Sequence, residues 1–170
     1  MELGLYENAT YLAEKDTFPN GCHVAEVEID PDTGFVQLDR YTVVDDVGTV
    51  INPIGLKGQI HGGVAQGVGQ ILMEQVVWDR ESGQLLTASF LDYAMPRADT
   101  LTNVAIASNP VPTKYNPLGA KGAGEAGTVG ALPATMNAVM DALACVGVDE
   151  LDMPATSARV WTAIQRAKGQ

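Results

Sequence analysis

A single carboxylate, Glu125, stands in a stretch of small residues, KGAGEAG, at positions 121–127. Glycine and alanine add little side-chain bulk, so the carboxylate can stand free while backbone amides line the surface around it. A carboxylate placed in this way can accept a proton as a general base. It can equally be a surface glutamate at the start of a helix, where the helix dipole favours negative charge. The local residues leave both interpretations open.

The glycines of this stretch also match the phosphate-binding pattern GxGxxG, from Gly122 to Gly127. That pattern binds a dinucleotide when it lies between a buried strand and a helix. The preceding residues include Pro110, Pro112 and Pro117, and prolines at this density are incompatible with a buried parallel strand. We therefore reject a dinucleotide-binding loop.

The histidines and the paired aspartates do not form a metal or hydrolase site. His23 and His61 are the only histidines, and no pair of residues shows ligand spacing. A GxSxG motif is absent. Asp45 and Asp46 are adjacent in an expected strand, so their carboxylates should point to opposite faces, one of them serving a turn or a cap. We expect no metal ligands among the side chains.

The composition indicates an ordered chain that does not bind nucleic acid. The 170 residues are 46% hydrophobic and 18% charged, which fits one globular domain. A net charge of −11 would repel nucleic acid and anionic membranes. We find no long apolar run and no secretory signal, and expect no membrane span and a cytoplasmic location. Cys22 and Cys145 form no CxxC pair, and we expect each to be a buried small apolar residue.

A glycine-rich helix is the most unusual element that could position Glu125. Asn52 is a suitable N-cap and Pro53 a suitable first helical residue. A helical wheel places apolar side chains on one face and small residues on the other. The apolar face holds Ile60, Val64, Val68 and Ile71, and the small face holds Gly55, Gly58, Gly62, Ala65 and Gly69. Gln59 and Gln66 border the small face.

Six glycines, at positions 55, 58, 62, 63, 67 and 69, weaken this helix. Each costs about 0.8–1 kcal/mol relative to alanine, so together they cost about 5–6 kcal/mol, comparable with the net stability of a small domain. Close packing against another backbone would compensate, and so would the close approach of a ligand. Gln66 supports the ligand alternative because its amide both donates and accepts hydrogen bonds.

The other elements predict an α+β fold and not an alternating βαβ series. We expect a lead-in over residues 1–17, a β-hairpin over 22–46 with its turn at PDTG, and a second hairpin over 80–96 with its turn at 81–83. Residues 96–120 are expected to be irregular. A helix should follow over 133–147, with Pro133 early and Gly147 as its stop. A last amphipathic helix, SARVWTAIQRA, should begin after Thr156 as N-cap.

Several separated motifs resemble one enzyme family in the same order. They are VVDDVGTVINP (43–53), GQIHGGVAQGVGQ (58–70), LDYAMP (91–96), NPLGAKGAGEAGTVGALPATMNAVMDAL (116–143) and DMPATSARVWTAI (152–164). The chain resembles the large, molybdenum-binding subunit of the xanthine dehydrogenase/aldehyde oxidase superfamily, especially bacterial aerobic carbon-monoxide dehydrogenase large chains. The resemblance implies that residues 1–170 are the C-terminal segment of a molybdenum-cofactor-binding domain, either as a fragment or as a split subunit.

The resemblance also implies a reaction and a set of site residues. The family hydroxylates a carbon with water at a molybdenum–molybdopterin cofactor, in bacteria usually the cytosine dinucleotide form. Glu125 corresponds to the family's catalytic base, which activates the hydroxyl on the metal. Gln66 resembles a cofactor-contacting position. Further cofactor candidates are Gln59, Gly63, Gly67, Asp46, Lys121, Gly122 and Gly124, and Lys121 could either neutralise a cofactor phosphate or position the loop.

The implied enzyme needs more than this chain contains. Electrons would leave through iron–sulfur clusters and FAD on partner subunits, and the rest of the large subunit would cover the glycine-rich faces. The substrate could be carbon monoxide, an aldehyde or an N-heterocycle, because the family's substrate loops lie outside these motifs. The alternative function is a non-catalytic assembly segment of a split large subunit.

Overall fold

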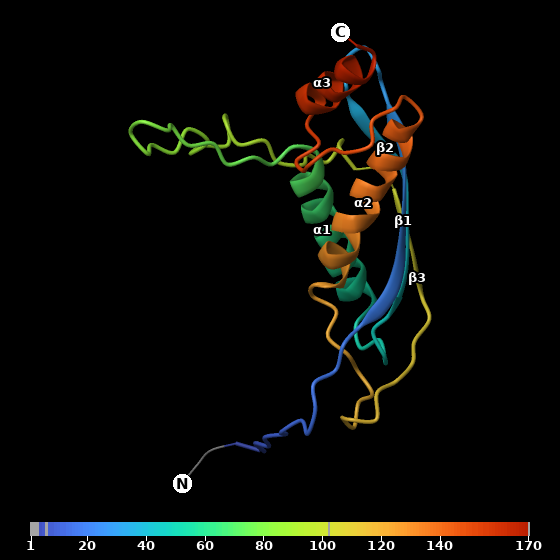
Figure 1. The fold of residues 1–170 in the computed structure, drawn as a ribbon. Coiled ribbons are helices and arrows are strands. Elements are labelled where there is room, and N and C mark those ends of the chain that lie inside the picture. Colours follow the sequence, from blue (N-terminus) through green and yellow to red (C-terminus); the bar gives the residue numbers. More distant parts are fainter. Residues whose placement is uncertain (1–3, 6, 102, 170) are drawn as a thin grey trace.

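The computed structural model describes residues 4–5, 7–101 and 103–169. The described residues form a three-stranded sheet and three helices, in the order β1, β2, α1, β3, α2 and α3 (Figure 1). This is the α+β fold that the sequence predicts. Within those ranges, the helices lack the length and apolar character needed to cross a membrane.

The first hairpin is confirmed. Strand β1 (Asn20–Ile29) pairs antiparallel with β2 (Val36–Asp46), and a bulge shifts the register between Glu26 and Val27. The turn closes where the amide of Gly34, at φ +70°, donates to the carbonyl of Asp30 at 2.8 Å. A left-handed backbone suits glycine, so PDTG is correctly read as the turn.

Residues 96–120 are not wholly irregular, because they contain a third strand. Strand β3 (Val104–Ser108) runs parallel to β2, with Val104 opposite Tyr41 and Ser108 opposite Asp45. The strand has only five residues, and Pro110 and Pro112 follow it closely. An alternation of apolar and polar residues this short does not predict a strand. The pairing partner lies more than 60 residues earlier in the chain, so no local pattern reveals it.

The glycine-rich helix is confirmed as α1 (Pro53–Leu72). The side chain of Asn52 caps it by accepting a hydrogen bond from the amide of Gly55 at 2.9 Å. All four residues of the predicted apolar face are buried. Gly69 is also buried, contrary to its place on the wheel, because the chain returns over it and brings Pro96 against it.

The last two helices differ in how well the sequence predicts them. Helix α2 (Ala126–Ala144) begins seven residues before Pro133, which lies inside it, so the expected start is wrong. Proline removes one helical hydrogen bond, but it does not prevent a helix held by tertiary packing. Helix α3 (Ser157–Ala167) covers the predicted segment, with Thr156 at the N-cap position.

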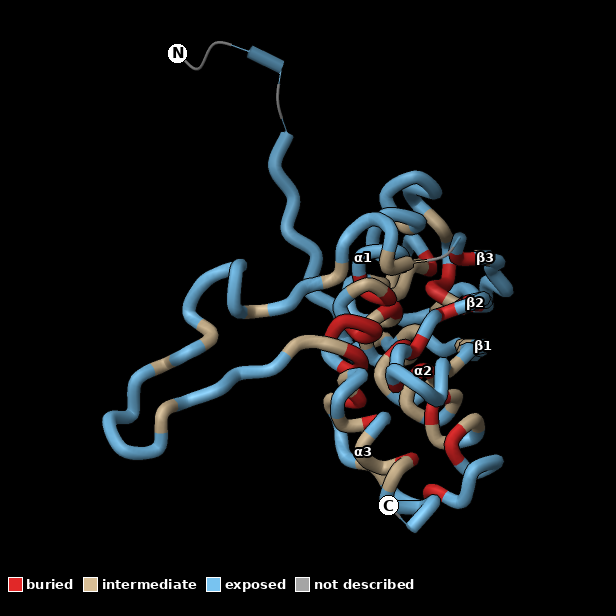
Figure 2. Tube along the Cα trace, turned by 90° about the horizontal axis from the view of Figure 1, so that it is seen from above, coloured by how far each residue is buried: buried red, intermediate tan, exposed pale blue. Residues whose placement is uncertain are grey.

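Helices α1 and α2 lie side by side on one face of the sheet (Figure 1). Buried residues gather where these helices meet each other and the sheet, as Figure 2 shows. The outer face of the sheet stays open and includes exposed Cys22, Val24 and Val44. Cys145 is exposed as well, at the end of α2, so the expectation of two buried cysteines is wrong.

The expected second hairpin is instead a long projection, here called the arm (residues 74–100), that leaves the body between α1 and β3 (Figure 1). A turn does form, where the amide of Gly83 donates to the carbonyl of Asp79 at 2.9 Å. The described part of the arm contains only an isolated bridge between Trp78 and Leu85 and no longer strand. A two-stranded ribbon without a third layer is marginal in water, which explains why pairing stops there.

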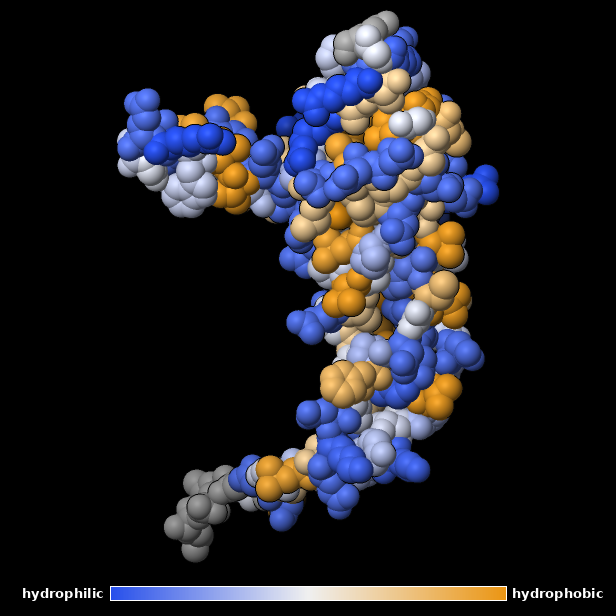
Figure 3. All heavy atoms as spheres, in the orientation of Figure 1, coloured by the Kyte–Doolittle hydropathy of each residue, from blue (hydrophilic) through white to orange (hydrophobic). Residues whose placement is uncertain are grey.

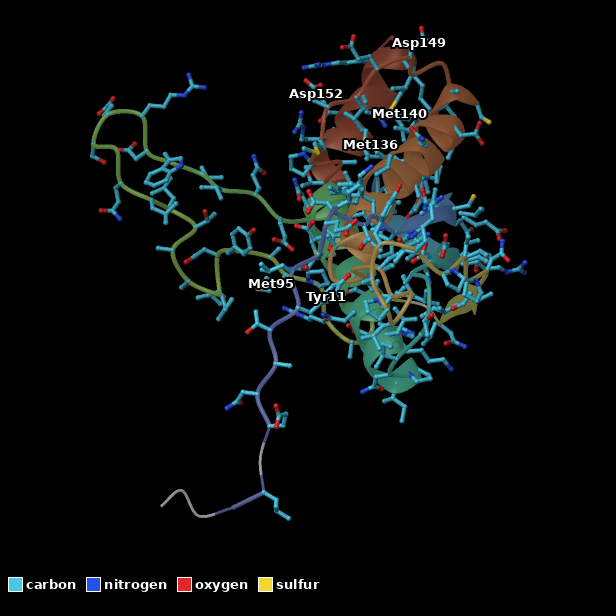
Figure 4. The ribbon with its side chains drawn as sticks, turned by 90° about the horizontal axis from the view of Figure 1, so that it is seen from below. Tyr11, Met95, Met136, Met140, Asp149 and Asp152 are labelled. Carbon is cyan, nitrogen blue, oxygen red and sulfur yellow. The ribbon has the colours of Figure 1, made fainter. Side chains whose placement is uncertain are left out.

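The lead-in has neither helix nor strand in its described part, residues 4–5 and 7–19, and residues 1–3 and 6 lie outside the description. The hydroxyl of Tyr11 donates to the carbonyl of Tyr115 at 3.0 Å. Figure 4 labels Tyr11 on the lead-in and Met95 where the arm returns to the body. Both projections leave the body on the same side (Figure 1).

Candidate functional site

Glu125 lies at the junction between an irregular loop and helix α2. It occupies the N-cap position, but its exposed side chain makes no capping hydrogen bond. The loop before it follows an isolated bridge between Gly48 and Ala120. The carboxylate is therefore not engaged at the helix end, and a ligand or solvent can reach it.

Asp46 and Lys121, two of the predicted site residues, contact each other. Lys121 Nζ donates to Asp46 Oδ2 at 2.5 Å, and the amides of Gly48 and Val111 donate to Oδ1 at 2.8 Å each. The hydrogen bond from Lys121, helped by those from the Val111 and Gly48 amides, lowers the pKa of Asp46 to about 2. Asp46 also serves the turn after β2 while Asp45 points into the core, as the sequence predicts.

Gln59 and Gln66 lie exposed on α1, beside the start of α2. Thr128 Oγ1 donates to Gln66 Oε1 at 3.4 Å. Gln59 Nε2 lies 3.9 Å from the point that a β-carbon on Gly124 would occupy. Gln59, Gly124 and Lys121 line one groove of about 230 Å³. The structure thus brings together candidate residues from α1 and from the Glu125 loop, more than 60 positions apart in the chain.

Two of the candidate glycines, Gly63 and Gly67, lie between the helices. A β-carbon on Gly63 would approach the α-carbon of Gly127 to 2.9 Å, and one on Gly67 would approach the β-carbon of Ala131 to 2.5 Å. Either contact is too close for a side chain. Close packing against another backbone, the first of the two explanations offered by the sequence, accounts for these two positions.

Other glycines face open space. A β-carbon on Gly58, Gly62 or Gly122 would meet no described atom within 4 Å. These positions expose bare backbone on the same side as the two glutamines of α1 and along the Glu125 loop. Packing within the described chain does not account for glycine there, so for these positions the second explanation, the close approach of a ligand, stays a prediction.

A buried polar cluster lies on the sheet side of α2, and the sequence analysis did not identify it. His23 Nδ1 and Tyr41 Oη lie 2.8 Å apart, and His23 Nε2 lies 3.4 Å from Asp45 Oδ1. Burial raises the pKa of Asp45, and the charge and hydrogen bond of His23 oppose that rise. Asp45 Oδ2 has no hydrogen-bond partner among the described residues. The ring of His23 covers Gly130 of α2.

The strand register could have revealed this cluster. His23 pairs with Val43, and Tyr41 and Asp45 lie two residues to either side of Val43, so the three polar side chains share the inner face. As far as the chain is described, no group of three His, Cys, Asp or Glu side chains lies close enough to hold a metal ion.

Comparisons with known proteins identify relatives of the whole chain. Residues 2–102 match the model of the molybdopterin cofactor-binding domain family. The chain is 41% identical over 162 residues to the nicotine 6-hydroxylase large subunit of Paenarthrobacter nicotinovorans, which covers 95% of this chain and 20% of that protein. It is 38% identical over 165 residues to the carbon monoxide dehydrogenase large chain of Hydrogenophaga pseudoflava, covering 97% and 20%.

Solved structures show the same likeness in three dimensions. The Cu,Mo-CO dehydrogenase matches with a TM-score of 0.84 and 34% identity, over 88% of this chain and 19% of that one. Quinoline 2-oxidoreductase from Pseudomonas putida 86 matches with a TM-score of 0.83 and 39% identity, over 86% and 19%. The chain spans about one fifth of the length of the curated relatives it matches.

Proposed function

We infer what this chain does from its family, because it belongs to the molybdopterin cofactor-binding domain family, among relatives that are molybdenum hydroxylases. We propose that it forms the C-terminal segment of a large subunit that hydroxylates a carbon with water. The aligned share supports a segment of a larger subunit, since nearly all of this chain matches one fifth of each relative.

The exposed residues around Glu125 fit a large cofactor. Gly58, Gly62 and Gly122 leave open space where a side chain would otherwise project. Gln59 and Gln66 offer amides that donate and accept hydrogen bonds to a pterin or its phosphate groups. We propose that these glutamines, with Gly122 and Gly124, hold a molybdenum–molybdopterin cofactor, in the cytosine dinucleotide form. Gly63 and Gly67 contribute indirectly, by letting α2 approach α1.

Glu125 is proposed as the catalytic base. The bound cofactor would supply the redox chemistry of the hydroxylation, and iron–sulfur and FAD subunits would take the electrons onward. In this proposal the carboxylate of Glu125 accepts a proton from water. Water releases that proton when its oxygen is transferred to the substrate carbon. The free, exposed carboxylate at the start of α2 is the observation that supports this role. The substrate would be carbon monoxide, an aldehyde or an N-heterocycle.

We propose that the rest of the large subunit covers the exposed apolar side chains of the arm. Large hydrophobic side chains of the arm are exposed, among them Trp78, Phe90 and Leu91 at 57%, 85% and 94% exposure. Figure 3 shows hydrophobic patches on the surface of the arm. A groove of about 760 Å³ at the root of the arm is lined by Leu72, Met95 and residues of β2. The exposed apolar side chains of the arm favour a protein partner there, because exposed apolar patches often mark interaction sites. The cytoplasmic location expected from the sequence stays a prediction.

The substitution Glu125→Gln in the assembled enzyme tests the proposal. It removes the proton acceptor while keeping the size and shape of the side chain, so turnover should fall by at least 1000-fold with molybdenum and pterin content unchanged, an effect of about 4 kcal/mol on the barrier. Glu28→Gln, at an exposed position of β1, is the matched control and should keep full turnover. Substantial turnover in Glu125→Gln, or an assembled complex without molybdenum, would favour the non-catalytic assembly segment instead.

A further inference from the structure

The carboxylate of Asp46 joins three segments that are distant in the chain. It binds the amide of Gly48 after β2, the amide of Val111 after β3 and the ammonium of Lys121 before the Glu125 loop. The side chains of Lys121 and Asp46 are only 11% and 13% exposed, so little water competes for their contact. A charge-assisted hydrogen bond is stronger in such a setting than in open water.

The backbone at Lys121 is fixed as well. Its amide donates to the carbonyl of Val47 at 2.9 Å, and the carbonyl of Gly119 accepts from the amides of Thr49 and Thr113 at 2.9 and 3.0 Å. Lys121 therefore lies at the end of a well-bonded stretch. The side chain of Lys121 adds its ionic contact with Asp46 at the same position.

The segment between Lys121 and Glu125 is flexible by composition. It contains Gly122 and Gly124, and a β-carbon at either position would meet open space or a single atom at 3.9 Å. On its far side, Gly127 packs against α1 and fixes the start of the helix. The carbonyl of Glu125 accepts from the amide of Val129 at 3.0 Å, so the backbone of Glu125 belongs to the start of α2. Residues 122–124 are thus a short glycine-containing link between two fixed points, Lys121 and the helix start that carries the Glu125 carboxylate.

We propose that Asp46 and Lys121 form a positioning clamp for Glu125 and do not contact the cofactor. The inference rests on the proposed function, in which Glu125 is the base, and it decides between the two roles that the sequence leaves open for Lys121. A lysine that neutralises a phosphate must present its ammonium to the ligand, whereas Nζ of Lys121 is turned to Asp46 and is nearly buried. Asp46 likewise uses both carboxylate oxygens within the chain.

Hydrogen exchange on the full 170-residue chain tests the clamp directly. Lys121→Met keeps the length of the side chain and removes its charge, so exchange of the hydrogen-bonded amides of residues 119–121 should accelerate at least tenfold. Lys121→Arg keeps the charge and donors and should restore slow exchange. Lys114→Met, an exposed lysine of the preceding loop, is the matched control and should leave exchange in that segment unchanged. Unchanged exchange in Lys121→Met would overturn the clamp.

The assembled enzyme gives a second and separate readout. If Lys121 positions Glu125, Lys121→Met should lower kcat at least tenfold while KM, molybdenum content and pterin content stay the same, and Lys121→Arg should recover most of the rate. Loss of cofactor from Lys121→Met with unchanged amide exchange at residues 119–121 would overturn the proposal, because it would make Lys121 a direct cofactor contact. A different experiment tests the proposed function: it fails if turnover survives in Glu125→Gln. The hydrogen-exchange result for Lys121→Met does not depend on that outcome.

Discussion

Gly63 of α1 and Gly127 of α2 lie in direct backbone contact. A β-carbon on Gly127 would lie 3.1 Å from the α-carbon of Gly63 and 2.7 Å from the carbonyl oxygen of Ile60. Neither residue can accept a side chain unless the helices separate. The contact also sets the start of α2 beside α1, where Gly124 approaches Gln59 and Thr128 contacts Gln66.

Gly63→Ala should therefore destabilise the chain. Alanine favours a helix over glycine by about 1 kcal/mol, but a methyl group forced into this interface costs about 1–3 kcal/mol, and backbone atoms on the facing helix cannot rotate away. We expect a net loss of stability, measured as a lower urea midpoint with an unchanged m-value.

Gly62→Ala is the matched control on the same helix. A β-carbon there meets open space, so the gain in helix propensity of about 0.5–1 kcal/mol is unopposed and the urea midpoint should rise. If both variants shift the midpoint in the same direction, helix packing does not explain Gly63. In the assembled enzyme Gly62→Ala should impair cofactor retention, because its open side is the proposed contact.

Acid should release the contact between Asp46 and Lys121. An unfolded aspartate titrates near pH 3.9, about two units above the pKa of about 2 that Asp46 has in the folded chain. The unfolded state therefore takes up the proton first, so the stabilisation is complete above about pH 4 and is lost as the pH falls towards 2. The thermal midpoint should fall over that range.

Asp46→Asn isolates this contribution from the other acidic groups, such as Asp30 and Asp79, whose pKa values are also lowered by local hydrogen bonds. The variant should melt lower than the unmutated chain at about pH 5, and the difference should shrink as the pH approaches 2. A difference that stays constant with pH would mean that the charge of Asp46 contributes nothing.

The sequence predicts the local part of this fold. Alternation and PDTG give the first hairpin, Asn52 and Pro53 give the start of α1, and the apolar spacing gives α3. It also places Gln59 and Gln66 at the border of the small-residue face of α1. Each of these features is set by residues within one turn or one strand of one another.

The remaining features depend on contacts across the chain. Strand β3 pairs with β2, α2 is helical through Pro133 because it packs on α1 and β1, and the bond between Asp46 and Lys121 spans 75 positions. Such pairings follow from the tertiary fold and leave no periodic trace in the sequence. The proposed role of Glu125 follows from the family resemblance, because its neighbours alone favour a surface glutamate at the start of a helix.

The ring of His23 and Gly130 of α2 should be energetically coupled. A β-carbon on Gly130 would lie 2.6 Å from three atoms of the ring, which Tyr41 and Asp45 hold in place. Gly130→Ala should therefore destabilise the chain by about 1–3 kcal/mol. His23→Ala removes the obstacle, so the double variant should be more stable than the sum of the single effects predicts. Additive effects in this double-mutant cycle would contradict the contact.

The arm should matter for assembly and not for the stability of the chain alone. Phe90 and Leu91 are 85% and 94% exposed, so replacing both with serine should change the free energy of unfolding by no more than about 0.5 kcal/mol each. The same change should weaken the binding of this chain to the rest of the large subunit at least tenfold. The binding partner in this measurement is a large subunit from which the segment aligned with this chain has been removed. Arg80→Ser, at the exposed tip, is the control and should bind normally. Equal retention of both variants would show that the arm is not the docking surface, because its apolar side chains would then be unnecessary in the complex.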